Sequence, residues 1–428
     1  MRKGISILLM LATFVLSAQQ IVKPEKLKPQ VVVNEYHGVK LEDPYQYLED
    51  LNDPKVMNWM RSNTNYAENI LEAIPARDEM IRKIEEMDSR KAANISNLSI
   101  TRNDNYYYLK TRPQDQTGKL YFRKGYEGEE KLLLDPDKYK EDSEATYTIG
   151  SVIPDHSGNR VAVILEPDGS ENGELVILDQ NGKQLNETVD LVMMATWGPD
   201  DKSLYCLKFN SADVTDMERQ KNLKVYKHTI GAEGKNDLEV FSSAKYPSMN
   251  IKPEEIPIMI YDKDSDKTYG LVVTVNKAIK LYMKEPDLSG EWKQLTRPED
   301  NVSSFATNKE SIFYTTFKDA PNFKIMRSDL SDPEFGKAKN FIPEPEMGPI
   351  DDVTVTKDGL YYTVKSNGVE TRLYSRPYAS DIGQQIELPL TAGTASVTSK
   401  GPDFSDMWVN ITGWTTPGKR FKYLPDSN

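Results

Sequence analysis

The pattern of apolar and polar positions changes once along the chain, close to residue 90. Apolar residues recur at helix spacing between residues 53 and 87. Asp53 is suited to cap a first helix, Pro54 fits its first turn, and Pro75 ends it. The pattern therefore predicts two consecutive helices, the second running from Arg77 to Met87. The first helix is expected to carry Val56, Trp59, Met60, Asn63, Tyr66 and Ile70 at recurring positions.

From about Asn97 onward the period becomes two, and short apolar strands such as RVAVIL, SLYCLKF and YGLVVTV alternate with polar turns. Turns such as PDHSGN, DKDSDK and TKDG recur roughly every 45 to 55 residues, and each interval holds about four strand signals. The spacing predicts a mainly β fold, a seven-bladed β-propeller that follows a short helical arm. A pair of β-sandwiches is the alternative. The predicted blades start near Leu98, Tyr147, Leu191, Met249, Val302, Val353 and Ala395.

The first eighteen residues have the order of a signal peptide. Arg2 and Lys3 are followed by an apolar run of about a dozen residues, too short to span a bilayer, and by the small residues Ser17 and Ala18. We therefore predict a signal peptide over residues 1–18, a helical arm over 19–90 and the propeller over 91–428. The mature chain is expected to begin near Gln19 and to be exported, to the periplasm or outside the cell.

Composition narrows the possible partners. The 428 residues include 28 % charged residues and have a formal net charge of -12. An acidic surface disfavours nucleic acid and anionic membranes as partners. The single cysteine, Cys206, lies in a strand-like segment and cannot form a disulfide within the chain. We interpret it as a small core residue.

The sequence shows no constellation typical of catalysis. It contains no G-x-S-x-G, H-E-x-x-H, P-loop or G-x-G-x-x-G motif. Its three histidines are far apart: His37 lies in an acid-rich segment of the arm, His156 in a turn that should be solvated, and His228 at the end of a strand. Because a catalytic triad assembles in space, separation alone does not exclude one. The prediction is nevertheless that the chain holds no catalytic residue.

One acidic turn resembles the beginning of a calcium loop. Asp262, Asp264 and Asp266 have the required spacing, but Lys267 stands where a glycine is needed and Val273 where a bidentate glutamate is needed. We interpret the segment as a solvated turn between strands. No metal and no cofactor is predicted.

Several motifs resemble the prolyl oligopeptidase family of serine peptidases. The segment YHGVKLEDPYQYLED, residues 36–50, is similar to the N-terminal signature of that family, and the helix after it also matches. A more specific match is the stretch 320–333, with APNFK and DLSDP. Weaker similarity lies at 222–231 and 415–418. Together these matches cover roughly residues 24 to 424.

The resemblance implies a fold and a division of labour. In this family a seven-bladed propeller covers an α/β-hydrolase domain that carries the Ser, Asp and His, and the hydrolase domain includes the N-terminal arm. The resemblance implies that this triad lies beyond Asn428 and that the arm, Val22 to about Ala73, is half of a domain. It also places Met249 and Ile177 near family positions that line the substrate cavity, although packing within the core is the favoured interpretation for both.

Two functions follow as hypotheses. The first is the propeller-and-arm portion of an endopeptidase that cleaves short peptides after proline, with the propeller restricting access; by itself the chain would be inactive. Its partners would be proline-containing peptides and the hydrolase portion. The alternative is an exported, non-enzymatic propeller that binds protein or peptide. A metal-using propeller enzyme is a third option, which the scarcity of histidine disfavours.

Overall fold

The structure is a computed structural model that describes residues 23–185 and 188–425. The predicted signal peptide lies outside these residues. The chain separates into two compact units, one up to Ala92 and the other from Ala93 onward. Within the described residues, none of the helices combines the length and the apolar character needed to cross a membrane.

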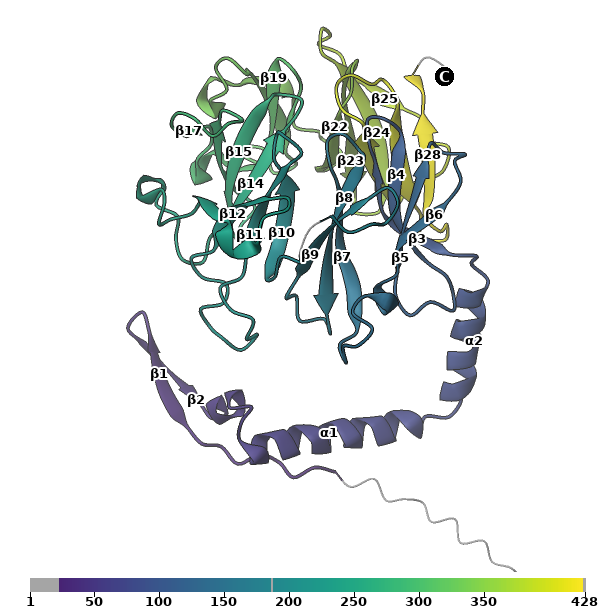
Figure 1. Cartoon of the computed structure of the whole chain (residues 1–428), viewed down its shortest axis with the longest axis vertical. Helices are drawn as coiled ribbons and strands as arrows, with labels where there is room; N and C mark the ends of the chain where they lie inside the picture. Colours follow the sequence, from purple (N-terminus) through teal and green to yellow (C-terminus); the bar gives the residue numbers. More distant parts are fainter. Residues whose placement is uncertain (1–22, 186–187, 426–428) are drawn as a thin grey trace, which may run out of the picture. The chain divides into compact units, whose positions relative to one another are not determined.

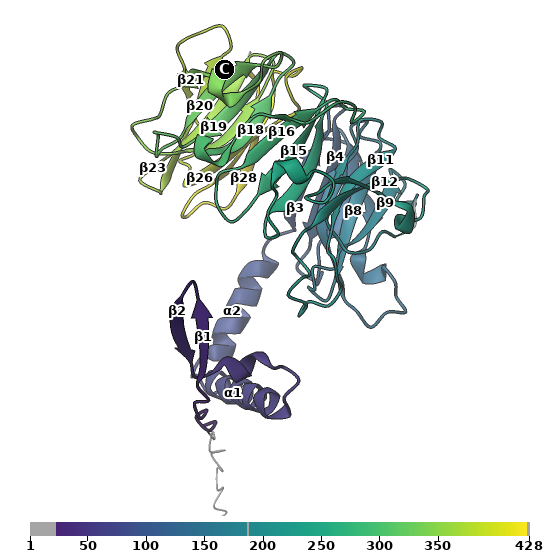
Figure 2. The same ribbon diagram turned by 90° about the vertical axis from the view of Figure 1, so that its left-hand side faces the viewer.

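The first unit consists of a hairpin, a short 3-10 helix and two α-helices (Figure 2). His37 and Gly38 form the hairpin turn, both with positive φ. The Asp53 side chain accepts a hydrogen bond of 2.8 Å from the Lys55 amide and caps the first helix, as predicted. The two predicted helices are confirmed, whereas the hairpin was not foreseen. The elements are β1 (Val32–Tyr36), β2 (Val39–Asp43), η1 (Gln46–Glu49), α1 (Pro54–Glu72) and α2 (Arg77–Ser89).

The second unit contains seven antiparallel sheets, each built from strands consecutive in the sequence, which confirms the seven-bladed propeller (Figure 1). Blade 1 comprises β3 (Asn94–Ile100), β4 (Asn105–Thr111), β5 (Lys119–Lys124) and β6 (Lys131–Leu134). Blade 2 comprises β7 (Tyr147–Pro154), β8 (Arg160–Pro167) and β9 (Glu174–Asp179). Blade 3 comprises β10 (Val192–Trp197), β11 (Ser203–Lys208), β12 (Lys224–Thr229) and β13 (Leu238–Phe241).

Blade 4 comprises β14 (Ile256–Asp262), β15 (Lys267–Val273), β16 (Lys280–Lys284) and β17 (Lys293–Gln294). Blade 5 comprises β18 (Val302–Thr307), β19 (Ser311–Thr316), β20 (Lys324–Asp329) and β21 (Lys339–Ile342). Blade 6 comprises β22 (Ile350–Val355), β23 (Gly359–Ser366), β24 (Glu370–Pro377) and β25 (Gln384–Ile386). Blade 7 comprises β26 (Thr394–Ser399), β27 (Met407–Thr412) and β28 (Lys419–Tyr423). Short helices η2 (Pro136–Lys138), η3 (Gly234–Asn236), η4 (Pro247–Met249), η5 (Pro298–Asp300) and η6 (Phe335–Lys337) lie in the connections.

Six apolar clusters join consecutive blades. Each cluster combines buried side chains from two neighbouring blades, from blades 1 and 2 through to blades 6 and 7. A single four-stranded sheet cannot bury both of its faces, so each blade depends on its neighbours for its core. The apolar side chains of each strand are therefore buried only when the neighbouring blades are in place.

The junction between blades 7 and 1 is more polar. Lys400 of blade 7 pairs with Asp104 of blade 1 at 3.0 Å, and its side chain is only 6 % exposed. Arg102 of blade 1 pairs with Asp403 of blade 7 at 2.9 Å. Among the described residues, no apolar cluster is shared by these two blades. Ion pairs thus replace the continuous apolar core where the ring closes.

Candidate functional site

The propeller has two faces that differ in the side chains they expose. The order of the strands within each blade decides which turns lie on which face. The first strand of each blade lies toward the centre, where β3 approaches β7, β10 approaches β14, and β22 approaches β26. Because these first strands run in the same direction, their turns into the second strands meet on one face, here called the hairpin face. The first strands begin on the opposite face, here called the start face, together with the turns between second and third strands.

A cavity of about 600 Å³ lies at the hairpin-face mouth of the central channel. Residues at the ends of the first strands of six blades line it. The Arg102 guanidinium, in the first turn of blade 1, bonds to Asp264 in blade 4 as well as to Asp403 in blade 7. Blades 1 and 4 are not neighbours in the ring, so the Arg102–Asp264 pair crosses the mouth of the channel. Lys309 of blade 5 also pairs with Asp403.

The electrostatics of this mouth favour the charged state of the Asp403 carboxyl. Hydrogen bonding to Lys309, and then to Arg102, lowers the pKa of the Asp403 carboxyl below its ordinary value. Desolvation, with a hydrogen bond to Asp266, raises the pKa of Tyr261 to about 12, so this hydroxyl stays protonated at neutral pH. The network therefore persists across the neutral pH range.

The acidic turn 262–266 has a larger role than the predicted solvated loop. Asp262 accepts hydrogen bonds from the Ser265 hydroxyl at 2.6 Å and from Thr307 of the next blade. Asp264 receives Arg102 from across the channel. The sequence could not predict these contacts because turns from several blades meet at the mouth, and the sequence of one turn does not show which other turns lie beside it. Among residues 23–185 and 188–425, no group of three or more His, Cys, Asp or Glu is placed to hold a metal ion.

The histidines of the propeller are more enclosed than their sequence context indicated. His156 is half-buried, with its Nδ1 2.7 Å from Asp201 and its ring edge-on to Tyr261. His228 lies near the end of β12, as expected, but is fully buried, with Nδ1 2.8 Å from Asp237. In the described part of the chain, no serine hydroxyl is hydrogen-bonded to either ring or to His37. Each of these two rings is therefore held by one carboxylate, Asp201 for His156 and Asp237 for His228.

The other residues singled out in the sequence lie in packed regions. Cys206 is fully buried, and desolvation raises the pKa of its thiol to about 12, so it is not a reactive thiolate. Ile177 is fully buried between blades 2 and 3. Met249 is half-buried against the cluster between blades 3 and 4 and lines a second pocket.

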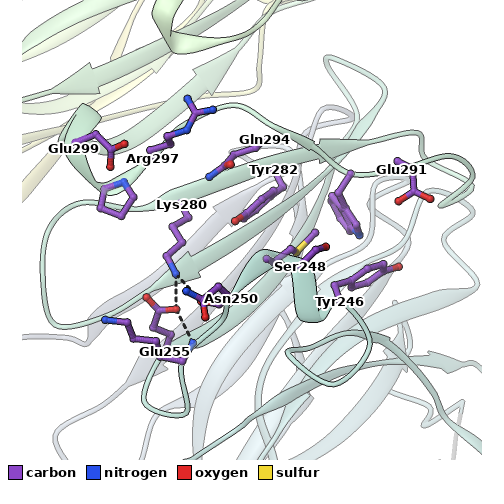
Figure 3. A pocket seen from close by; sticks show the side chains of 14 residues that line it. Tyr246, Ser248, Asn250, Glu255, Lys280, Tyr282, Glu291, Gln294, Arg297 and Glu299 are labelled. Carbon is purple, nitrogen blue, oxygen red and sulfur yellow. Dashed lines mark hydrogen bonds and ion pairs between the residues drawn. The ribbon is translucent and has the colours of Figure 1, made fainter.

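This second pocket has a volume of about 550 Å³ and lies on the start face of blade 4 (Figure 3). At one end, Lys280 pairs with the buried Glu255 at 2.6 Å. At the other end Trp292 meets Tyr246 edge-on, with their ring centroids 6.2 Å apart. The pocket therefore has aromatic rings at one end and an ion pair at the other. The charges of Lys280 and Glu255 already neutralise each other.

Exposed apolar side chains are numerous on the start face. Val275 is fully exposed, and Trp414 is 82 % exposed in the turn between β27 and β28. Val214 and Met217 project from a loop whose base is fixed by Arg219, which stacks on Phe209 at 3.6 Å. The start-face set is Ile95, Met193, Met194, Val214, Met217, Val275, Met347, Val369 and Trp414. A smaller set lies on the hairpin face: Tyr126, Leu132, Leu238, Ile382 and Leu424.

The arm also presents apolar surface. The outward positions of α2 are exposed, with Met80 at 63 % and Met87 at 59 %. In α1, by contrast, Val56 is buried within the arm's own unit. Trp59 is half-buried and donates a hydrogen bond to the carbonyl of Glu25. The exposed apolar residues of the hairpin and of α2 are Val32, Val33, Tyr36, Val39, Leu41, Met80, Ile81, Ile84 and Met87.

Taken together, these features define a seven-bladed β-propeller with an appended helical arm and exposed apolar surface on both. The chain belongs to the prolyl oligopeptidase family: residues 24–428 match the family model for the prolyl oligopeptidase N-terminal β-propeller domain. The resemblance inferred from the arm motif and from the stretch 320–333 is thereby confirmed.

Individual relatives agree with this assignment. The chain is 25 % identical over 411 residues to a prolyl endopeptidase of Elizabethkingia meningoseptica, covering 94 % of this chain and 56 % of the relative. It is 23 % identical to the prolyl endopeptidase of Elizabethkingia miricola, covering 92 % and 54 %. The chain thus spans about half the length of the curated relatives it matches.

Solved structures share the fold. One from a study of two prolyl endopeptidases superposes with a TM-score of 0.81 at 21 % identity, covering 94 % of this chain and 58 % of that one. Prolyl oligopeptidase B from Galerina marginata, bound to a 35-residue substrate, gives a TM-score of 0.78 at 18 % identity, covering 95 % and 60 %.

Proposed function

We propose that this chain is the propeller-and-arm portion of a serine endopeptidase that cleaves short peptides after proline. The observation that carries the proposal is the unpaired apolar surface of α2, β1 and β2, together with the exposed apolar side chains of the start face. Each large apolar side chain left in water forgoes about 1.5–3 kcal/mol of burial. Such surface is typical of an interface, and an α/β-hydrolase portion that carries Ser, Asp and His is the partner we propose.

The role we propose for the propeller is to restrict access to the reaction site. Because the pair between Arg102 and Asp264 crosses the hairpin-face mouth, peptides would not pass through that mouth and would reach the inner cavity on the start-face side, between the propeller and the proposed hydrolase portion. Export is a further part of the proposal, based on residues 1–18. N-terminal sequencing of the exported protein should then begin near Gln19.

The test uses activity and association together. The chain alone should not cleave a chromogenic peptide with proline before the scissile bond, whereas the chain combined with the hydrolase-like segment encoded in the same genome should. The coding sequence after the codon for Asn428 is the first place to look for that segment. Turnover by this chain alone, abolished by a serine-directed inhibitor, would contradict the proposal.

A pair of variants on α2 tests the interface. Replacing the apolar Ile84 by glutamine should weaken association with the hydrolase portion by about tenfold or more, since one buried Ile side chain contributes about 1.5–3 kcal/mol. Replacing the neighbouring polar Arg82 by glutamine serves as the matched control and should leave affinity nearly unchanged. Equal effects of the two substitutions on the measured Kd would argue against this face as the interface.

The pocket in Figure 3 supports a second candidate, a non-enzymatic propeller that binds peptide by itself. Aromatic rings beside polar groups are suited to extended proline-containing segments. The two candidates differ in a simple observation: the second predicts peptide binding by a stable monomer that gains neither activity nor affinity from any hydrolase portion.

A further inference from the structure

A separate pocket of about 510 Å³ lies between blades 5 and 6 on the hairpin face, outside the central channel. Arg327 from β20 and Arg376 from β24 line it, together with Lys337 and Lys339. The motifs and the proposed activity leave these four cations without a role. Their contacts show how far each positive charge is already compensated within the protein.

Arg327 has no carboxylate partner among the described residues. Its Nε donates to the Ser311 hydroxyl at 2.9 Å and its Nη1 to the Tyr378 carbonyl at 3.3 Å, both of them neutral acceptors. A guanidinium has five N–H donors, so these two bonds leave most of its capacity unused. The group is half-buried, 5.7 Å from the ring centroid of Phe313 and 5.6 Å from that of Phe341.

Arg376 is more deeply buried and only weakly compensated. Its side chain is 10 % exposed, and it bonds to the Asp381 carbonyl at 2.8 Å and to the Asp381 carboxylate at 3.2 Å. The side chain of Asp381 is itself fully exposed, so its carboxylate is held only by this contact. The Nε of Arg376 is buried without any hydrogen-bond partner.

Both guanidinium groups lie over the same ring. The Arg376 guanidinium carbon is 4.8 Å from the centroid of Phe341, the ring that Arg327 also approaches. Two like charges on one aromatic ring repel each other, and partial burial strengthens that repulsion. The remaining acids offset it only in part: Asp332 pairs with Lys337 at 2.8 Å, and Asp329 accepts from the Ser331 amide of its own turn and acts on Arg327 only at a distance.

We propose that this pocket binds an oxyanion, a phosphate or carboxylate group, between Arg327 and Arg376. The planar fork of a guanidinium matches the geometry of both groups and can hold either with two parallel hydrogen bonds. The anion would use the free donors of Arg327, displace the exposed carboxylate of Asp381 from Arg376, and relieve the repulsion across Phe341. Lys337 and Lys339 add positive charge at the rim.

The test titrates the folded full chain with inorganic phosphate and, in a separate experiment, with acetate, both in a chloride buffer. Calorimetry measures binding in both titrations, and phosphorus NMR measures it in the phosphate titration. We expect saturable binding of at least one anion. Arg327→Met keeps the apolar stem and should weaken binding about tenfold or more, because a charge-assisted hydrogen bond is lost. Asp381→Asn removes the competing carboxylate and should tighten binding.

The matched control is Arg372→Met, on the same strand β24 but paired with Glu370 and outside the pocket. It should bind as the unmodified chain does. The opposite effects of Arg327→Met and Asp381→Asn separate a specific site from general loss of structure. Absence of binding by the folded chain, or equal affinities for Arg327→Met and Arg372→Met, would overturn the proposal. Phosphate without acetate binding identifies a tetrahedral ligand, and the reverse a carboxylate; either supports the site.

Discussion

Single residues decide how closely the blades approach. Gly270 lies in the middle of β15, a place where glycine normally weakens a strand. A Cβ at this position would lie 2.8 Å from the ring of Phe241 and 3.1 Å from that of Trp292. The two rings pack 5.0 Å apart across the junction of blades 3 and 4. Gly270 is thus the residue that makes room for this aromatic contact.

Substitution of Gly270 by alanine should destabilise the propeller. Overpacking of a closely packed core costs roughly 1–3 kcal/mol. The measurement is the free energy of unfolding in denaturant. Gly336 is the control, because a Cβ there meets nothing within 4 Å. Gly336→Ala should change stability little, and similar losses for both variants would refute the packing argument.

At the scale of elements, local signals are strongest in the arm. The cap at Asp53, the proline at the first position of α1 and the break before Arg77 all act within a few residues. They need no distant partner, which is why the bounds of both helices could be predicted closely. The hairpin of β1 and β2 is different, because each of its strands has only five residues and almost every side chain is exposed, so the apolar alternation in β2 is too short to signal a strand.

Removing the cap tests the local origin of α1. Asp53→Ala should cost the helix about 0.5–2 kcal/mol, since an orphan amide at its beginning loses its acceptor. Hydrogen exchange of the amides in α1 should quicken, while unfolding of the propeller stays unchanged. Asp78, which is 96 % exposed and whose side chain makes no cap contact, provides the control, and Asp78→Ala should leave exchange in α1 as it was.

At the scale of the whole propeller, ring closure depends on charges far apart in the sequence. Arg102 pairs with residues 162 and 301 positions away. The pKa of Asp403 is lowered from its ordinary value of 3.8 by Lys309 and then by Arg102. Because the pKa of Asp403 is lower in the folded state than in the unfolded state, its carboxylate stabilises the fold at every pH above the ordinary pKa of 3.8. That contribution is lost as the pH falls through the folded-state value.

The melting temperature of the propeller should therefore fall as the pH drops below about 4, and less steeply in Asp403→Asn. Because Asp403 is largely exposed, its contribution at neutral pH should be only about 0.2–1 kcal/mol and should shrink in high salt. Asp142→Asn, at an exposed position without a described ion pair, is the control. A pH profile for Asp403→Asn that matches the unmodified chain would refute this role.

The blade starts show how far the sequence pattern reaches. Predicted starts near Tyr147, Leu191 and Val302 agree with the observed strands within a residue. The start predicted near Met249 is seven residues early, because β14 begins at Ile256. The apolar residues of the preceding connection, including Tyr246 and Met249, pack against the blade and imitate a strand. Periodicity alone cannot separate such a packed connection from a strand.

The amino-acid sequence by itself determined the period of two, the sevenfold recurrence of polar turns and the two helices of the arm, because each depends on neighbours in the chain. Only the tertiary structure decided which turns meet. It brought Arg102 to Asp264 across the channel, enclosed His228 with Asp237, and placed Arg327 and Arg376 over one phenylalanine ring. The first of these contacts depends on the closure of the ring, and the other two depend on packing within one blade and between neighbouring blades. None of the three is visible in the alternation of apolar and polar residues along a single strand.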